Sequence, residues 1–313
     1  MQPNERQGPE RPRTWTSRSI GSRFQHEIFY RLIRIGGRRL AYFMLHPVVS
    51  YYVLCRPSVR RKTHYYLRRR FPDGKSSARW VDSYRMLLKL GQVLADRASV
   101  GILGPREMRV ELSGREKLLQ LLGERRGLIL LLSHAGSWQV ALSALGFLNL
   151  PVNLLLDREP GDIDRQYFEH AGRSCPYRVI DPQGYLGGTL EMLQVLKKGE
   201  VLCLMGDRVF GSNRSYVKID FLGAQAPFPI SAFKLASAAS VPVAVLFSYK
   251  TGIDRYELKI ARIIRVPENL GRSGDAFRPY VSQFAAELEA FVQEHPYQFF
   301  NFYNMWQAHP ASA

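Results

Sequence analysis

Cysteine is scarce in this chain. The 313 residues include only Cys55, Cys175 and Cys203. Three cysteines cannot form a disulfide framework, and their separation fits no metal-ligand spacing. We therefore expect no metal site. We also expect no cofactor. Unpaired cysteines are typical of a reducing compartment, so the composition favours the cytoplasm.

The N-terminal part lacks a hydrophobic run long enough to cross a bilayer. Residues 40–54 are aromatic and aliphatic, but this stretch is shorter than the roughly 20 residues that an upright spanning helix needs. Pro47 lies within it and is expected to kink a helix. Residues 1–19 are polar and arginine-rich, without the apolar centre of a signal peptide. We expect a disordered basic tail at 1–18 and a helical segment at 19–75.

Acidic residues are nearly missing from the first 70 positions. Fifteen arginines and one lysine there face three glutamates, so this segment carries +13 of the net charge of +17. A basic chain can bind nucleic acid, but no zinc site, helix-turn-helix or aromatic RNA-binding motif is present. Basic residues on both sides of an apolar stretch favour a helix or helical hairpin lying on an anionic membrane surface. The alternative is a buried helical layer on the main domain.

Phosphate-binding P-loops, GxGxxG dinucleotide loops and GxSxG nucleophile elbows are also lacking. From residue 127 onwards, short apolar runs alternate with helical patterns, which predicts a mostly parallel sheet with helices on both faces. The expected strands are 127–133, 151–156, about 177–180, 201–206 and 241–248, with 256–263 as an edge strand. The expected helices are 76–123 with breaks at Gly101 and Gly104, and about 137–147, 162–172, 186–198, 229–239 and 276–294. We therefore expect one α/β domain at 76–313.

A histidine follows the first of these strands. His134 stands after the apolar run 127–132 and before the small residues Ala135, Gly136 and Ser137. Open α/β sheets place ligands at the carboxyl ends of their strands, and imidazole can take a proton from a hydroxyl near neutral pH. The alternative is a structural histidine that caps a helix or is satisfied in the core.

Charged residues follow two further strands. Arg158 follows the expected strand 151–156. Gly206-Asp207-Arg208 lies at the end of the expected strand 201–206. If these strands are parallel, their carboxyl ends meet at one edge, which brings His134, Arg158 and Asp207-Arg208 around one crevice. This convergence favours a functional role for His134.

Three motifs in fixed order resemble the lysophospholipid acyltransferase-like superfamily, in its bacterial branch of lipid A late acyltransferases and related proteins. They are Ser133-His134-x4-Gln139, Gly206-Asp207-Arg208 and Phe221-Leu222-Gly223-x4-Phe228-Pro229, followed by the aromatic tail 295–306. The resemblance covers roughly residues 110–307. It implies acyl transfer from an acyl-carrier-protein or coenzyme A thioester to a lipid hydroxyl or amine, at the cytoplasmic face of a bacterial inner membrane.

The resemblance also implies residue roles. His134 would be the general base, and Arg158 and Arg208 would hold a phosphate or the developing oxyanion. Asp207 would orient Arg208. Gly223, Phe228 and Pro229 belong to the motif expected to bind substrate.

One position departs from the family pattern of histidine, four residues, and then Asp or Glu. Gln139 occupies the acidic position; its amide can orient an imidazole but cannot stabilise imidazolium by charge. Three readings remain open. The enzyme is slower, or it recruits another carboxylate from Asp157, Glu159 or Asp207, or the chain is a non-catalytic relative that binds acyl lipid or acyl carrier. The intact flanking motifs favour an active enzyme.

Overall fold

A computed structural model describes residues 23–104, 108–124, 126–140, 150–156, 177–209, 215–271 and 273–307. The helices are α1 (Arg23–Cys55), α2 (Pro57–Arg70), α3 (Ser76–Leu103), α4 (Arg115–Gly123), α7 (Thr189–Lys197), α8 (Ser231–Ala239) and α9 (Arg278–Glu294). Short 3₁₀ helices are η3 (Tyr185–Gly188), η4 (Asp275–Phe277) and η5 (Pro296–Gln298). The strands are β1 (Arg109–Ser113), β2 (Leu128–Leu132), β3 (Val152–Leu155), β4 (Arg178–Ile180), β5 (Val201–Met205), β6 (Tyr216–Phe221), β7 (Ala224–Pro229), β8 (Val243–Lys250) and β9 (Arg255–Ile264).

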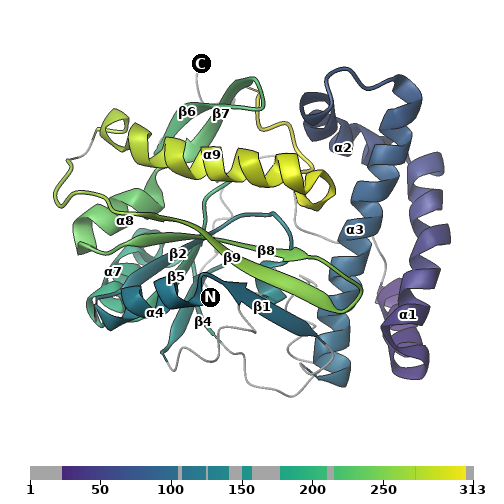
Figure 1. Ribbon diagram of the computed structural model, residues 1–313, viewed down its shortest axis with the longest axis horizontal. Helices are drawn as coiled ribbons and strands as arrows, with labels where there is room; N and C mark the ends of the chain where they lie inside the picture. The colour runs from purple at the N-terminus through teal and green to yellow at the C-terminus, as the bar shows by residue number, and fades with distance from the viewer. Residues whose placement is uncertain are drawn as a thin grey trace, which may run out of the picture.

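A seven-stranded sheet in the order β1-β9-β8-β2-β5-β3-β4 forms the centre of the molecule (Figure 1). Every neighbouring pair is parallel except β8 and β9. This confirms the predicted mostly parallel α/β sheet. The strand at 255–264 is not at the edge, as its alternating pattern had indicated, because β1 pairs with its outer side.

The core lies on both faces of this sheet. Side chains point to alternate faces along a strand, so Ile129 and Leu131 of β2 join one cluster and Leu128, Leu130 and Leu132 join the other. Helices α7, α8 and α9 and the β6–β7 hairpin contribute to the first cluster, and α4 contributes to the second. Burial on both faces explains why the central strands are continuous apolar runs.

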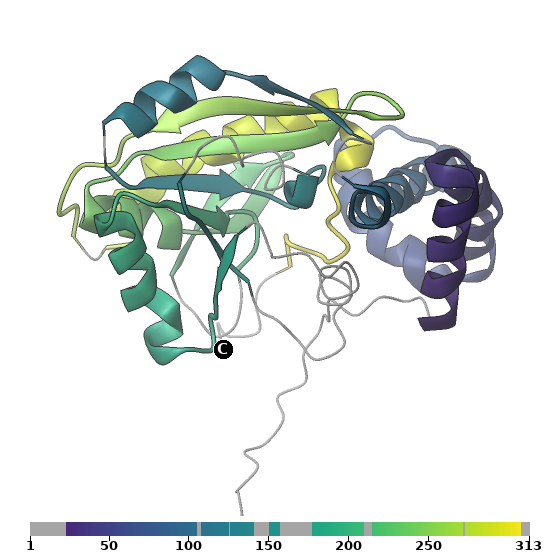
Figure 2. The same ribbon diagram turned by 90° about the horizontal axis from the view of Figure 1, so that it is seen from below.

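The three N-terminal helices stand together beside the sheet (Figure 2). The inner face of α1, with Ala41 and Leu45, packs against Ala95 and Ala98 of α3. Within α1 the backbone leaves helical geometry at Gly37, whose φ is 63°, and not at Pro47 as expected; a positive φ of this kind favours glycine. None of the helices in the described ranges is long and apolar enough to span a membrane.

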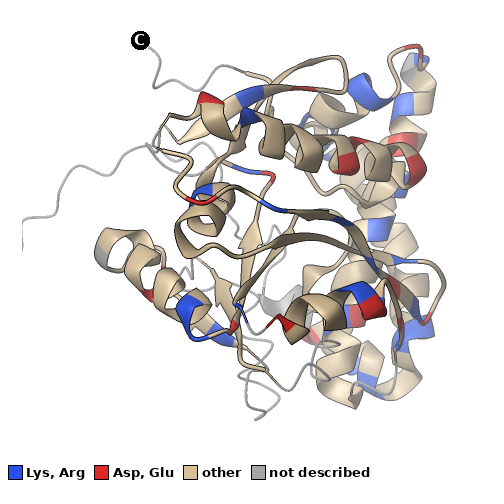
Figure 3. Cartoon of the chain, turned by 60° about the vertical axis from the view of Figure 1, so that its left-hand side comes forward, with Lys and Arg blue, Asp and Glu red and all other residues tan. Residues whose placement is uncertain are grey.

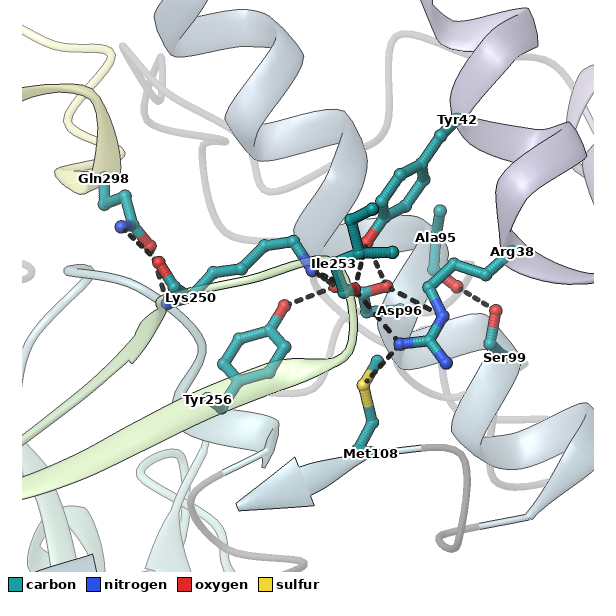
Figure 4. Close-up of polar contacts among 10 residues, drawn as sticks. All are labelled: Arg38, Tyr42, Ala95, Asp96, Ser99, Met108, Lys250, Ile253, Tyr256 and Gln298. Atoms are coloured by element: carbon teal, nitrogen blue, oxygen red, sulfur yellow. Dashed lines mark hydrogen bonds and ion pairs between the residues drawn. The ribbon is translucent and has the colours of Figure 1, made fainter. Parts of the chain in front are cut away.

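A buried charge cluster joins these helices to the sheet (Figure 4). The carboxylate of Asp96 on α3 accepts hydrogen bonds from Lys250 Nζ at 2.7 Å, from Tyr256 at 2.7 Å and from Tyr42 of α1. Arg38 Nε lies 3.8 Å from the same carboxylate. The side chain of Asp96 is fully buried, so these donors replace the water that it loses on folding.

Two predicted regions need correction. Residues 76–123 are not helical throughout, because α3 continues through Gly101, ends before Gly104 and is followed by β1. The Val217–Pro229 region forms the antiparallel β6–β7 hairpin, which we did not predict as strands. The tail at 1–18, the helix at 162–172 and all but the first turn of the helix at 137–147 lie outside the described residues.

Candidate active site

The loop after β2 carries His134 at the carboxyl edge of the sheet. It is held on two sides, since Ala135 bridges to Phe299 of the C-terminal segment and Gly136 bridges to Ser248 of β8. A Cβ at Gly136 would lie 1.7 Å from the Ser248 carbonyl oxygen. Glycine is therefore required for the close approach that fixes the loop.

The imidazole of His134 faces the carboxylate of Asp207. Nδ1 lies 2.9 Å from Oδ1 and 3.1 Å from Oδ2, and the backbone N–H of His134 donates to Oδ2 at 3.0 Å. The parallel register creates this contact because Leu132 of β2 pairs with Met205 of β5, so the second residues after that pair are His134 and Asp207. The residues after β2 and β5 therefore lie in contact at one edge of the sheet, as predicted.

Burial and neighbouring charges shift the pKa values of His134 and Asp207. Burial and the positive charge of Arg208 lower the pKa of His134 against the opposing effect of Asp207. Burial acts to raise the pKa of Asp207, but the His134 ring, Arg208 and the His134 backbone N–H outweigh it and hold this pKa below its ordinary value. At neutral pH the pair is thus a carboxylate beside a neutral imidazole.

This arrangement can accept a proton. The Asp207 carboxylate occupies Nδ1, which fixes the ring tautomer with its proton on Nδ1 and its lone pair on Nε2. The His134 side chain is 23% exposed, whereas that of Asp207 is 1% exposed. A substrate can therefore approach the imidazole while the carboxylate stays enclosed behind it.

Arg208 braces the same loop from the C-terminal side. Its Nη2 donates to the carbonyl oxygen of Phe300 at 2.9 Å, and the N–H of Phe300 donates to the carbonyl oxygen of His134 at 2.8 Å. The guanidinium also lies 5.5 Å from the centre of the Tyr303 ring. Arg208 is buried. The Asp207 carboxylate, which was expected to orient Arg208, is hydrogen-bonded to His134.

Gln139 is directed towards α3. With its amide assigned from the surrounding donors, its side-chain oxygen accepts from Arg97 Nη1 at 2.9 Å and from the Trp138 indole at 3.3 Å. The acceptor at His134 Nδ1 is therefore Asp207 and not Gln139. Of the carboxylates considered from the sequence, Asp157 and Glu159 lie outside the described residues, as does Arg158.

The third motif lies on the β6–β7 hairpin. Gly223 is in the turn between the two strands, and Pro229 ends β7 opposite Tyr216. Phe228 is fully buried and packs edge-on against Phe221 and Phe284. Phe228 was predicted to bind substrate. Its ring is part of the core and has no exposed surface with which to do so.

Sequence reasoning missed the contribution of the C-terminal segment. Gln298 accepts from the N–H of Gly136 through its backbone carbonyl at 2.6 Å, and its side chain bonds the backbone N–H and carbonyl of Lys250 at 2.8 and 3.0 Å. The sequence contained one sign that this segment matters, the resemblance of the aromatic tail to the family. That resemblance did not indicate a contact with the His134 loop.

Cys203 is no candidate nucleophile. It lies within β5 and is fully buried. Burial raises the pKa of its thiol well above the usual range, and the thiol form is a poor nucleophile.

One of the comparisons with known proteins agrees with the resemblance. No curated protein matches the chain. The family model described as bacterial lipid A biosynthesis acyltransferase matches residues 12–308, which include the N-terminal helices, the sheet and the C-terminal segment. The chain therefore belongs to the bacterial lipid A biosynthesis acyltransferase family and is an acyltransferase that transfers an acyl group to a lipid.

Proposed function

We propose that this acyltransferase uses an acyl-carrier-protein or coenzyme A thioester as donor, a lipid hydroxyl or amine as acceptor, and His134 as general base. The hydrogen bond between His134 Nδ1 and Asp207 is the observation that carries the proposal. It leaves Nε2 to face the acceptor, on a ring whose pKa is lowered. A neutral imidazole at neutral pH can take the acceptor's proton.

The transfer then needs no covalent enzyme intermediate. As Nε2 takes the proton, the acceptor oxygen or nitrogen attacks the thioester carbonyl carbon and forms a tetrahedral intermediate. Collapse breaks the carbon–sulfur bond, and the imidazolium returns the proton to the thiolate. The products are the acylated lipid and the free thiol. Asp207 stabilises the imidazolium by its charge, which is the role that Gln139 cannot fill.

Arg208 supports this step through position and charge. Its contact with Phe300 holds the segment that fixes the His134 loop. Its positive charge adds to the larger effect of the His134 ring in lowering the pKa of Asp207. We retain Arg158 as a candidate for binding a phosphate or the oxyanion. The alternative of a non-catalytic relative rested on Gln139. It is not favoured, since Asp207 supplies the carboxylate.

A direct assay tests this function. The purified full chain is incubated with radiolabelled acyl-carrier protein or acyl-coenzyme A and bacterial membrane lipid. We expect a labelled lipid product from the wild type and a loss of about 10²–10⁴-fold in His134→Ala. Equal product from both proteins would remove His134 from the base role. Product with only one donor would identify the carrier.

We further propose that α1 and α2 hold the enzyme on the cytoplasmic face of the bacterial inner membrane. Phe43, Tyr51 and Leu54 lie on the outer side of α1 and are 66%, 49% and 62% exposed. Lysine and arginine residues run along the N-terminal helices (Figure 3). Arg31, Arg34, Arg39, Arg56, Arg61 and Lys62 are exposed. Apolar side chains between basic residues suit the interface of an anionic membrane.

A further inference from the structure

A hollow of about 640 Å³ lies between the C-terminal end of α2, the β6–β7 turn and α9. None of His134, Asp207 and Arg208 lines it, although Gly223 of the third motif does. Its charged lining consists of Arg68, Arg69, Arg70 and Glu289. The lining is therefore positive overall.

The positive charge continues beyond the hollow. Helix α2 contains Arg60, Arg61, Lys62, Arg68, Arg69 and Arg70, and its sequence has no acidic residue. Glu289, the one acidic residue among the described residues of the lining, accepts a hydrogen bond from the Leu222 N–H at 3.1 Å. The hollow thus attracts anions. The Glu289 carboxylate is hydrogen-bonded to the β6–β7 turn.

Two of the three arginines are held in place. Arg69 lies over the Trp306 ring, with 4.7 Å between Cζ and the ring centre. Trp306 in turn stacks on Phe221 and donates to its carbonyl oxygen at 3.0 Å. Arg70 donates to the carbonyls of Val292 and Gln293, at 3.0 and 2.8 Å, at the end of α9. Held side chains lose less conformational entropy when a ligand binds.

Arg68 differs from its neighbours. Its side chain is exposed, and within the described part of the chain no hydrogen bond or ion pair holds its guanidinium. Tyr65 and Asn304 add a hydroxyl and a side-chain amide to the same lining. A guanidinium fork beside neutral donors matches the oxygens of a phosphate group.

We propose that this hollow binds a phosphate group, carried either by a lipid or by a soluble ester. Arg68 and Arg69 supply the charge-assisted hydrogen bonds, and Tyr65 and Asn304 supply neutral ones. Arg70 keeps its position at the end of α9 and contributes charge. The site goes beyond the proposed chemistry, since no group in it takes part in acyl transfer.

The hollow and the active site share one segment. Phe300 is hydrogen-bonded to His134 and Arg208, and the Tyr303 ring lies against Arg208. Asn304 lines the hollow, and Trp306 supports Arg69. A phosphate in the hollow would therefore lie against the other end of the segment that fixes the catalytic loop.

Calorimetric titration of the full-length protein tests the proposal. The probes are glycerol 3-phosphate and a short-chain phosphatidic acid kept below its micelle concentration. Arg68→Gln and Arg69→Gln should each weaken binding by about tenfold. Arg61→Gln is the matched control, because it removes the same charge from the same helix outside the hollow. Arg68→Gln should fold normally since its side chain is exposed.

The outcomes separate the possible sources. Binding of both probes, or of glycerol 3-phosphate alone, supports a site for a soluble phosphate ester. Binding of the phosphatidic acid alone supports a lipid headgroup. Absence of binding by either probe, or equal weakening by Arg61→Gln, would overturn the site. His134→Ala should bind the probes as the wild type does, so failure here is distinct from failure of the catalytic proposal.

Discussion

At the residue scale, the sequence identified both members of the proposed catalytic pair, His134 and Asp207, but left open whether Gln139, Asp157, Glu159 or Asp207 contacts the histidine. His134 and Asp207 each follow an apolar run, so both could be placed at one edge of a parallel sheet. The choice between Asp207 and Gln139 depends on the β2–β5 register and on the close approach at Gly136. Such tertiary details leave no periodic pattern in a single sequence. The contact of Gln139 with Arg97 was hidden for the same reason.

Asp207→Asn tests how the carboxylate acts. The wild-type kcat/KM should fall as pH drops through the lowered pKa of His134, below the ordinary 6.5, because protonated imidazole is no base. Asparagine removes the charge that raises this pKa, so the acid limb should move to still lower pH. Turnover at neutral pH should fall by up to about 10⁴-fold. The pH–rate profiles of both proteins check this; an acid limb moving to higher pH would contradict it.

Gln139→Glu tests the departure from the family pattern. A glutamate at position 139 should pair with Arg97, because the native amide already contacts that guanidinium. We expect turnover to change by less than about tenfold, or 1.4 kcal/mol of barrier. Steady-state turnover provides the measurement. A larger gain would mean that residue 139 reaches the imidazole and that Asp207 is not its sufficient partner.

At the scale of elements, the apolar runs and the strands at 177–180 and 256–263 were predictable, whereas β1, β6 and β7 were not. β2 and β5 are buried and are continuous apolar runs, and β3 and β8 are buried and largely apolar. β1 has the alternating sequence Arg-Val-Glu-Leu-Ser and, among the described strands, lies at the edge of the sheet. Its few apolar residues did not separate it from the neighbouring helical patterns. The β6–β7 hairpin was missed because its residues were interpreted only as a motif.

The Asp96 cluster should contribute strongly to stability. Asp96→Asn removes the buried carboxylate that pairs with Lys250 and lies beside Arg38, which should lower the free energy of unfolding by about 3–5 kcal/mol. Denaturant unfolding measures the change.

Asp254→Asn is the control for this substitution. Asp254 forms an exposed ion pair with Arg109, and such a pair contributes less than about 1 kcal/mol. Equal losses in the two variants would show that the buried network does not couple the helices to the sheet.

At the scale of the whole molecule, the basic N-terminal helices are an integral part of the fold. Tyr66 and Leu67 of α2 belong to the main core, so deleting α1 and α2 would expose apolar surface. The membrane proposal is better tested by substitutions on the outer side of α1.

Leu54→Asp should weaken binding to anionic vesicles by about tenfold or more, because it removes an apolar contact and adds a repelled charge. Leu119→Asp on α4 is the matched control, since Leu119 is also exposed, by 43%, but lies away from α1. Vesicle flotation compares the two. Equal binding of Leu54→Asp and wild type would place the membrane contact elsewhere.

The central claim is that His134 and Asp207 act as one catalytic unit, and a double-mutant cycle on acyl transfer tests it most directly. Groups that act as a unit are strongly non-additive. Asp207→Asn should therefore cost up to about 10⁴-fold in the wild type and almost nothing in a His134→Ala background. The same loss in both backgrounds would mean that Asp207 acts independently of His134, and would contradict the account.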